Sequence, residues 1–250
     1  MTSSPLPDIV TEARRVIAAG EARDVPIRLI GGVAIRIRAD GTFQPALARA
    51  YKDIDLVTLK GRTKVVAALL EELGYEPHRT FNGINGHERL LFFDTAHGRQ
   101  LDVFVGAFRM CHEVPIEGRA MLDPATVPLA ELLLTKLQIF SLNEKDLRDA
   151  IAILSHHEVG DRDGDTINAG RVAELCADDW GLWRTCKLNV GRVREGVGDY
   201  DLGEGGEQRL LDRLDRLWAR IEAEPKSRGW RLRDRVGDRK QWYTEPEEVG

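Results

Sequence analysis

The chain has 250 residues, of which 42% are apolar and 31% are charged, and its formal net charge is −5. This composition is typical of a globular protein with one large domain or two small ones. The acidic balance excludes the overall basic surface that many nucleic-acid-binding proteins carry. Three cysteines without a CxxC spacing exclude a disulfide scaffold and a cysteine-rich zinc site. The charged N-terminal segment and the lack of a long apolar run predict a cytoplasmic protein with no membrane partner.

The N-terminal part of the chain, up to about residue 115, is predicted to form a small unit of helices and strands. Apolar periodicity and glycine positions define these elements. In chain order they are a helix over 8–20, a strand over 27–30, a short helix over 33–37, a strand over 53–58, a helix over 63–73, and two strands over 89–94 and 100–105. The last two strands flank a turn with Gly98 and are typical of a β-hairpin.

The remainder of the chain is predicted to be helical. The expected helices cover 129–140, 144–154, 171–177 and 208–223, and the first two are expected to pair because their connection is short. We therefore expect an α/β core over 1–120, a helical region over 121–225 and a basic, flexible tail over 226–250.

Two carboxylates alternate along the predicted strand 53–58. Asp53 and Asp55 point to one face of the strand, since successive side chains alternate. Two such carboxylates repel each other unless a positive group lies between them, and a divalent cation is a natural partner. The alternative is a solvated strand end with two ordinary surface aspartates.

A third carboxylate, Asp102, lies in an otherwise apolar strand. Leu101, Val103 and Val105 occupy one face of this strand and leave Asp102 on the other. Asp102 could complete a cation site with the first two acids, or it could face water on an edge strand. Asp94 is a competing candidate, but it lies at a strand end beside a turn.

Gly31-Gly32 lies where the predicted strand 27–30 meets a helix. Glycines at such a junction let a ligand approach the backbone, and the N–H groups of a helix start favour phosphate. A plain tight turn is the alternative. Further along, Lys136 falls on the apolar stripe of the helix 129–140, where it could snorkel to water or contact a phosphate. Asp146 or Asp149 on the next helix could pair with it.

The order of these motifs resembles the DNA polymerase beta-like nucleotidyltransferase superfamily. Its pattern is a glycine pair at a strand–helix turn, a DxD on the next strand and a third carboxylate on a later strand. Here these are Gly31-Gly32, Asp53 with Asp55, and Asp102. Within the superfamily, the chain looks most like the AbiEii/MenT toxin-like group. The residues that carry this likeness are Lys136 and the run Lys145–Asp149 before an apolar helix.

The resemblance covers roughly residues 25–156 and departs from the pattern in the long interval over 33–52, which implies a loop insertion near Gly41–Ala46. It implies an α+β fold, with a small mixed β-sheet nucleotidyltransferase core flanked by helices and a helical C-terminal region. It also implies an Mg²⁺-dependent enzyme that transfers a nucleoside monophosphate from an NTP to a hydroxyl and releases pyrophosphate.

The resemblance assigns a role to each residue of the pattern. Asp53, Asp55 and Asp102 would hold Mg²⁺, with Asp102 serving at a second metal position or as the base. Gly31, Gly32, Lys136 and Asp146 would bind the nucleotide, with Lys136 also contributing to catalysis.

The acceptor stays open at this point. The toxin-like group suggests RNA such as tRNA, or a protein, and a toxin role with a cognate antitoxin. An aminoglycoside-like small molecule is an alternative, and so is a non-catalytic binding protein on the same fold. The segment 226–240 is strongly basic and contains Trp230, which suits either a nucleic-acid contact or a solvated tail.

Overall fold

The computed structural model describes residues 4–39 and 43–245, and these fall into two compact units. The first unit consists of Met1–Asp40, Arg49–Phe108 and Pro115–Pro128. The second consists of Gly41–Ala48, Arg109–Val114 and Leu129–Gly250. Each unit buries apolar residues of its own. The predicted insertion at Gly41 lies partly outside the described residues.

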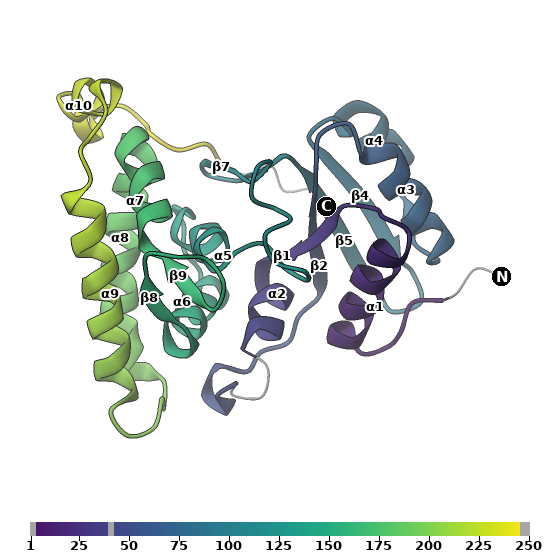
Figure 1. Ribbon diagram of the computed structural model, residues 1–250, viewed down its shortest axis with the longest axis horizontal. Helices are drawn as coiled ribbons and strands as arrows, with labels where there is room; N and C mark the ends of the chain where they lie inside the picture. Colours follow the sequence, from purple (N-terminus) through teal and green to yellow (C-terminus); the bar gives the residue numbers. More distant parts are fainter. Residues whose placement is uncertain (1–3, 40–42, 246–250) are drawn as a thin grey trace. The chain divides into compact units, whose positions relative to one another are not determined.

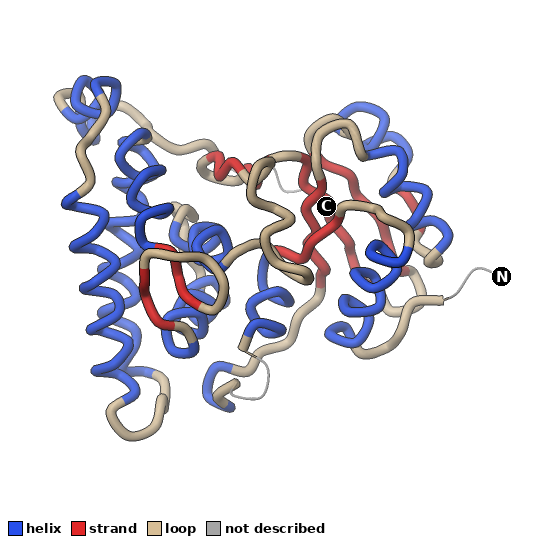
Figure 2. Tube along the Cα trace, viewed as in Figure 1, coloured by secondary structure: helices blue, strands red, loops and turns tan. Residues whose placement is uncertain are grey.

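A five-stranded mixed sheet forms the centre of the first unit (Figures 1 and 2). Its strands are β1 (Ile27–Ile30), β2 (Asp53–Thr58), β3 (Glu76–Pro77), β4 (Arg89–Asp94) and β5 (Arg99–Val105), in the order β1-β2-β5-β4-β3. The strands β2 and β5 are parallel, and the other neighbours are antiparallel. The predicted mixed sheet is therefore confirmed, and the predicted hairpin is the β4–β5 pair.

The helices that accompany this sheet are α1 (Ile9–Ala22), α2 (Gly31–Arg38), α3 (Thr63–Glu72) and α4 (Arg79–Asn85). The first begins after Asp8, whose carboxylate accepts the Thr11 amide at 2.8 Å and so caps the helix. The helix packs closely on the sheet at Gly20, where any side chain would clash with Ile27 of β1.

The two faces of the sheet differ in chemistry. Because register partners share a face, Asp55 of β2 and Asp102 of β5 point the same way, together with Asp53 two residues before Asp55. We call this the acidic face. The opposite face carries Ile27, against which α1 packs, and is called the α1 face.

Helices make up most of the second unit, as Figure 2 shows for residues 129 onward. They are α5 (Leu129–Leu137), α6 (Glu144–His156), α7 (Ala169–Asp178), α8 (Trp180–Gly196), α9 (Gly206–Ala223) and α10 (Arg228–Asp234). The short strands β8 (Glu158–Gly160) and β9 (Thr166–Asn168) form a parallel pair in this unit. At the boundaries of the two units in the sequence, β6 (Ala107–Arg109) pairs with β7 (Glu113–Pro115). As predicted, α5 packs against α6.

The basic segment near the C-terminus is partly helical over its described residues, rather than an irregular tail. It forms α10 and the 3-10 turn Gly237–Arg239. Trp230 is buried, and Asp234 accepts the indole N–H of Trp180 at 2.7 Å. The buried Trp230 ring and the Trp180–Asp234 hydrogen bond hold the segment against α8, so it is ordered despite its charge.

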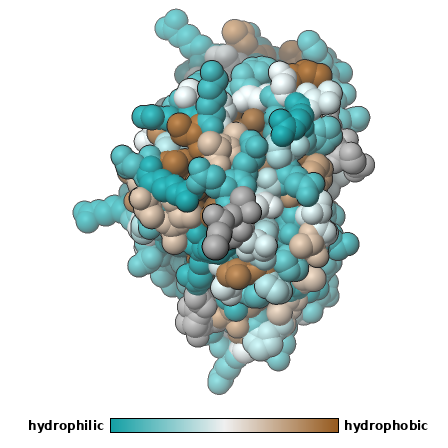
Figure 3. All heavy atoms as spheres, turned by 90° about the vertical axis from the view of Figure 1, so that its right-hand side faces the viewer, coloured by the Kyte–Doolittle hydropathy of each residue, from teal (hydrophilic) through white to brown (hydrophobic). Residues whose placement is uncertain are grey.

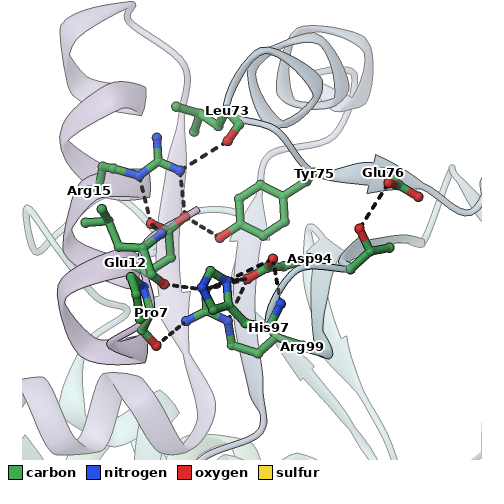
Figure 4. Close-up of polar contacts among 11 residues, drawn as sticks. Pro7, Glu12, Arg15, Leu73, Tyr75, Glu76, Asp94, His97 and Arg99 are labelled. Carbon is green, nitrogen blue, oxygen red and sulfur yellow. Dashed lines mark hydrogen bonds and ion pairs between the residues drawn. The ribbon is translucent and has the colours of Figure 1, made fainter. Parts of the chain in front are cut away.

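A dense polar network lies on the α1 face, where α1 starts and the β4–β5 hairpin turns (Figure 4). Glu12 is fully buried, and its carboxylate accepts two hydrogen bonds from Arg15 at 2.7 Å and one from the Tyr75 hydroxyl at 2.6 Å. Burial and then the hydrogen bond to Glu12 raise the pKa of Tyr75 well above its ordinary value. The neutral phenol is therefore the form that the folded protein keeps.

Asp94 belongs to the same network and not to the acidic face. Its carboxylate contacts Arg99 and His97, and Arg99 also donates to the carbonyls of Leu6 and Pro7 (Figure 4). These contacts tie the segment before α1 to the hairpin. Asp94 is thus a structural residue, which explains an acid at this strand end.

The face of the molecule drawn in Figure 3 carries apolar side chains in several small groups that hydrophilic side chains separate. Among the described residues, every helix is too short or too polar to span a lipid bilayer.

The Glu12 network makes a testable contribution to stability. Replacing Glu12 by Gln removes the charge that faces Arg15 and alters the acceptor for Tyr75, and we expect a loss of about 2–3 kcal/mol in the free energy of unfolding. Urea denaturation at pH 7 measures the loss. Glu21→Gln, at an exposed position of the same helix, should change it by less than about 0.5 kcal/mol. Equal effects of the two variants would contradict this account.

Candidate functional site

The structure brings two of the predicted carboxylates side by side. Asp55 and Asp102 are register partners on the adjacent parallel strands β2 and β5, and both lie on the acidic face. Asp53 precedes Asp55 by two residues and pairs in register with Gln100. Asp53 is exposed, Asp55 is half-buried and Asp102 is buried, so the row of acids leads from solvent into the unit.

Gly31 lies against the carboxylate of Asp55. It follows β1 directly, with φ of +74°, and its neighbour Ile30 is the register partner of Asp55. A Cβ atom placed on Gly31 would lie 2.2 Å from Oδ2 of Asp55. The position therefore requires glycine for two reasons, since a side chain would meet both the left-handed backbone and the carboxylate.

The first turn of α2 begins at this glycine. The residue before the helix, Ile30, has an extended backbone and no polar side chain to cap the helix start. The N–H groups of a first helical turn have no partner within the helix. An anion is therefore a suitable ligand for the amides at Gly31 and Gly32, next to the acidic face.

Asp102 is held by two neighbours on its own face. Its Oδ1 accepts a hydrogen bond from Nε of Arg89 and its Oδ2 accepts one from Nε2 of Gln100, both at 2.7 Å. The Arg89 guanidinium also lies near the rings of Phe104 and Phe81, at 5.3 Å and 5.9 Å from their centroids. The positive charge of Arg89 offsets the negative charge of Asp102, which lies beside Asp55.

The donor set of the acidic face fits a magnesium ion through two carboxylates. Mg²⁺ in nucleotide enzymes takes one or two carboxylates together with substrate phosphates, and hard carboxylate oxygens suit it. Asp53 and Asp55 supply such a pair on one strand. Both oxygens of Asp102 accept other hydrogen bonds, and no group of three or more His, Cys, Asp or Glu side chains among the described residues is arranged to hold a metal. The pair, rather than the predicted trio, is the set that fits.

Lys136 lies in the second unit, in α5, and pairs with α6. Its ammonium is 2.9 Å from Asp146 and 3.0 Å from Asp149, so the predicted pairing is present with both acids. Burial acts to lower the pKa of Lys136, but the carboxylates of Asp149 and Asp146 outweigh it and raise that pKa. The lysine is therefore a firmly charged link between two helices, and its contact with a nucleotide stays a prediction.

Two residues of this arrangement are missing from the sequence-based set, Arg89 and Gln100. The hairpin offered a signal for Arg89. If Asp94 is the register partner of Arg99, then Arg89 lies opposite Phe104, which is two residues from Asp102 on the same face. A charged residue at this position of an apolar strand was the available hint.

Gly31 can be tested against a glycine with the same backbone and open surroundings. Gly31→Ala should destabilise the protein by about 1–3 kcal/mol more than Gly61→Ala, because both have positive φ but only Gly31 faces a carboxylate. Chemical denaturation of the two variants measures the difference. Equal losses in the free energy of unfolding would show that the Asp55 carboxylate does not exclude a side chain at this position.

The Lys136 pair can be tested through stability. Lys136→Met leaves buried Asp149 without its cation, and we expect a loss of about 3–5 kcal/mol. Lys145→Met, at an exposed position of α6, should be nearly neutral. Thermal and urea unfolding provide the comparison, and a small loss for Lys136→Met would mean that the pair is not structural.

Comparisons with known proteins give structural neighbours only. No family model matches the chain, and no curated protein does. The antibiotic-resistance factor ANT(2'')-Ia in solution is similar with a TM-score of 0.40 and 16% identity, over 58% of this chain and 82% of that one. Its crystal structure with adenylyl-2''-tobramycin gives 0.41 and 15%, over 73% and 97%. An antigenic nucleotidyltransferase-like protein from Paracoccidioides brasiliensis gives 0.43 and 13%, over 90% and 97%.

Proposed function

We propose that the chain is a nucleotidyltransferase that moves a nucleoside monophosphate from an NTP to a hydroxyl acceptor and releases pyrophosphate. The observation that carries this proposal is the contact of Gly31 with Asp55. It sets a helix start with a positive-φ glycine directly beside a row of carboxylates on neighbouring strands. The sequence pattern supports the proposal, because the glycine pair, the DxD and the later acid follow each other in the order that the superfamily shows.

The helix start suits the phosphates of an NTP–metal complex, and the carboxylates suit its cation. The amides at Gly31 and Gly32 would bind phosphate oxygens of the triphosphate. Asp53 and Asp55 would hold Mg²⁺, which when bound offsets negative charge on the phosphates as pyrophosphate leaves. Side-by-side carboxylates repel each other, and a positively charged ligand at the accessible end of the row relieves part of that repulsion.

The acceptor remains a prediction from the resemblance. RNA such as a tRNA end, a protein side chain and a small molecule each offer a hydroxyl, and a toxin role with a cognate antitoxin goes with the first two. Every one of these acceptors uses the same chemistry at the acidic face, so the transfer of label tests the proposal whatever the acceptor is.

The direct experiment incubates the protein with each α-labelled NTP, Mg²⁺ and total RNA or cell extract, and follows transfer of label or labelling of the protein itself. We expect label transfer with the wild type and a loss of at least about 100-fold in Asp53→Asn/Asp55→Asn, because the metal ligands are removed. Asp161→Asn, at an exposed loop position, should keep wild-type transfer.

A second readout needs no acceptor. Mg²⁺ with the preferred NTP should raise the melting temperature of the wild type, because a ligand that binds only the folded state stabilises it, and should leave that of the Asp53/Asp55 variant unchanged. Equal shifts in both proteins, or no label transfer and no shift with any NTP, would contradict the proposed function.

A further inference from the structure

We infer that Arg89 binds an anionic oxygen of the nucleotide's phosphate chain, and that Asp102 holds Arg89 in place instead of serving as a third metal ligand. This inference rests on the proposed function and names a nucleotide-binding residue that the sequence pattern does not contain. It follows from the hydrogen bonds of Asp102, the position of Arg89 on the sheet and the surroundings of its guanidinium.

Arg89 lies on the acidic face. It is the register partner of Phe104, which follows Asp102 by two residues on β5, so its side chain extends from the same side of the sheet. Leu91, two residues later on β4, lies directly opposite Asp102. The Arg89 side chain therefore extends diagonally to Asp102 on the neighbouring strand β5, whose other neighbour β2 carries Asp55.

The guanidinium is oriented before any ligand binds. Its Nε donates to Asp102 at 2.7 Å, and the rings of Phe104 and Phe81 lie within 6 Å. Among the described residues, Asp102 is the one hydrogen-bond partner of this side chain, and a guanidinium has five N–H donors. The side chain is 23% exposed, and its outer nitrogens keep contact with solvent.

Asp102 is placed to hold this arginine more than to coordinate an ion. Its side chain is 5% exposed, and each of its two oxygens already accepts a hydrogen bond, from Arg89 and from Gln100. To coordinate a metal it would have to give up one of these bonds and leave the arginine without its anion. The planar fork of a held arginine, by contrast, matches the oxygens of a phosphate group.

Binding of the preferred NTP, measured by calorimetry with Mg²⁺ and again in EDTA, tests the inference. We expect Arg89→Gln to raise the Kd at least tenfold in both buffers, and Arg89→Lys to recover part of the loss, because the arginine meets the nucleotide directly. Asp102→Asn keeps the arginine but removes the charge that holds it, so its Kd should rise by less than that of Arg89→Gln, and by the same factor with Mg²⁺ and in EDTA. Arg23→Gln, which breaks an exposed ion pair with Glu72 elsewhere in the first unit, is the matched control and should bind as the wild type does.

The alternatives give different results. If Asp102 is a metal ligand that Arg89 only positions, Asp102→Asn will weaken binding in Mg²⁺ as much as Arg89→Gln does, and the effect of Arg89→Gln will vanish in EDTA; that pattern overturns the inference. An Arg89→Gln protein that binds as tightly as the wild type also overturns it. If Arg89→Gln fails to fold, Arg89→Lys and Asp102→Asn decide between the same two patterns. A wild type that binds no NTP would instead overturn the proposed function, and this inference with it.

Discussion

The proximity of two carboxylates on adjoining parallel strands is the constraint on which the acidic face depends. Asp55 and Asp102 are register partners, and Gly31 lies against the first of them while Arg89 and Gln100 hold the second. Like charges at such a spacing raise each other's free energy unless cations or hydrogen-bond donors offset them. The unit provides this compensation for Asp102 from its own side chains. The carboxylates of Asp53 and Asp55 are more accessible, and they are the ones that we propose bind a metal ion with its phosphates.

The acids on the two faces of the sheet have different roles in the first unit. On the α1 face, Glu12 and Asp94 are buried and satisfied by Arg15, Tyr75 and Arg99, so these acids stabilise the fold. On the acidic face, the row of acids runs from exposed to buried and is joined to a helix start. The same residue type thus has two roles, which burial and partners distinguish. Such a contrast is a better guide to function than the number of acids.

Strong local signals made much of the fold predictable from the sequence. Alternation fixed the strands around Asp55 and Asp102, and the apolar stripes of α1, α5 and α6 were clear. The 17-residue helix α8 was not predictable in this way, because it contains Gly181 and Gly191 and buries the polar Thr185 and Asn189. The residues of the site were predictable as types, but their partners were not: the bond of Arg89 to Asp102 depends on the hairpin register, which tertiary pairing sets. The order of the basic segment likewise depends on Trp230 and Asp234 meeting α8.

The most direct measurement of the central claim is a crystal structure with Mn²⁺ and a non-hydrolysable NTP, in which the anomalous signal of manganese locates the ion. We predict one ion bound to carboxylate oxygens of Asp53 and Asp55, with triphosphate oxygens on the amides at Gly31 and Gly32. An ion and a nucleotide bound elsewhere, with Asp53 and Asp55 contacting neither, would contradict it.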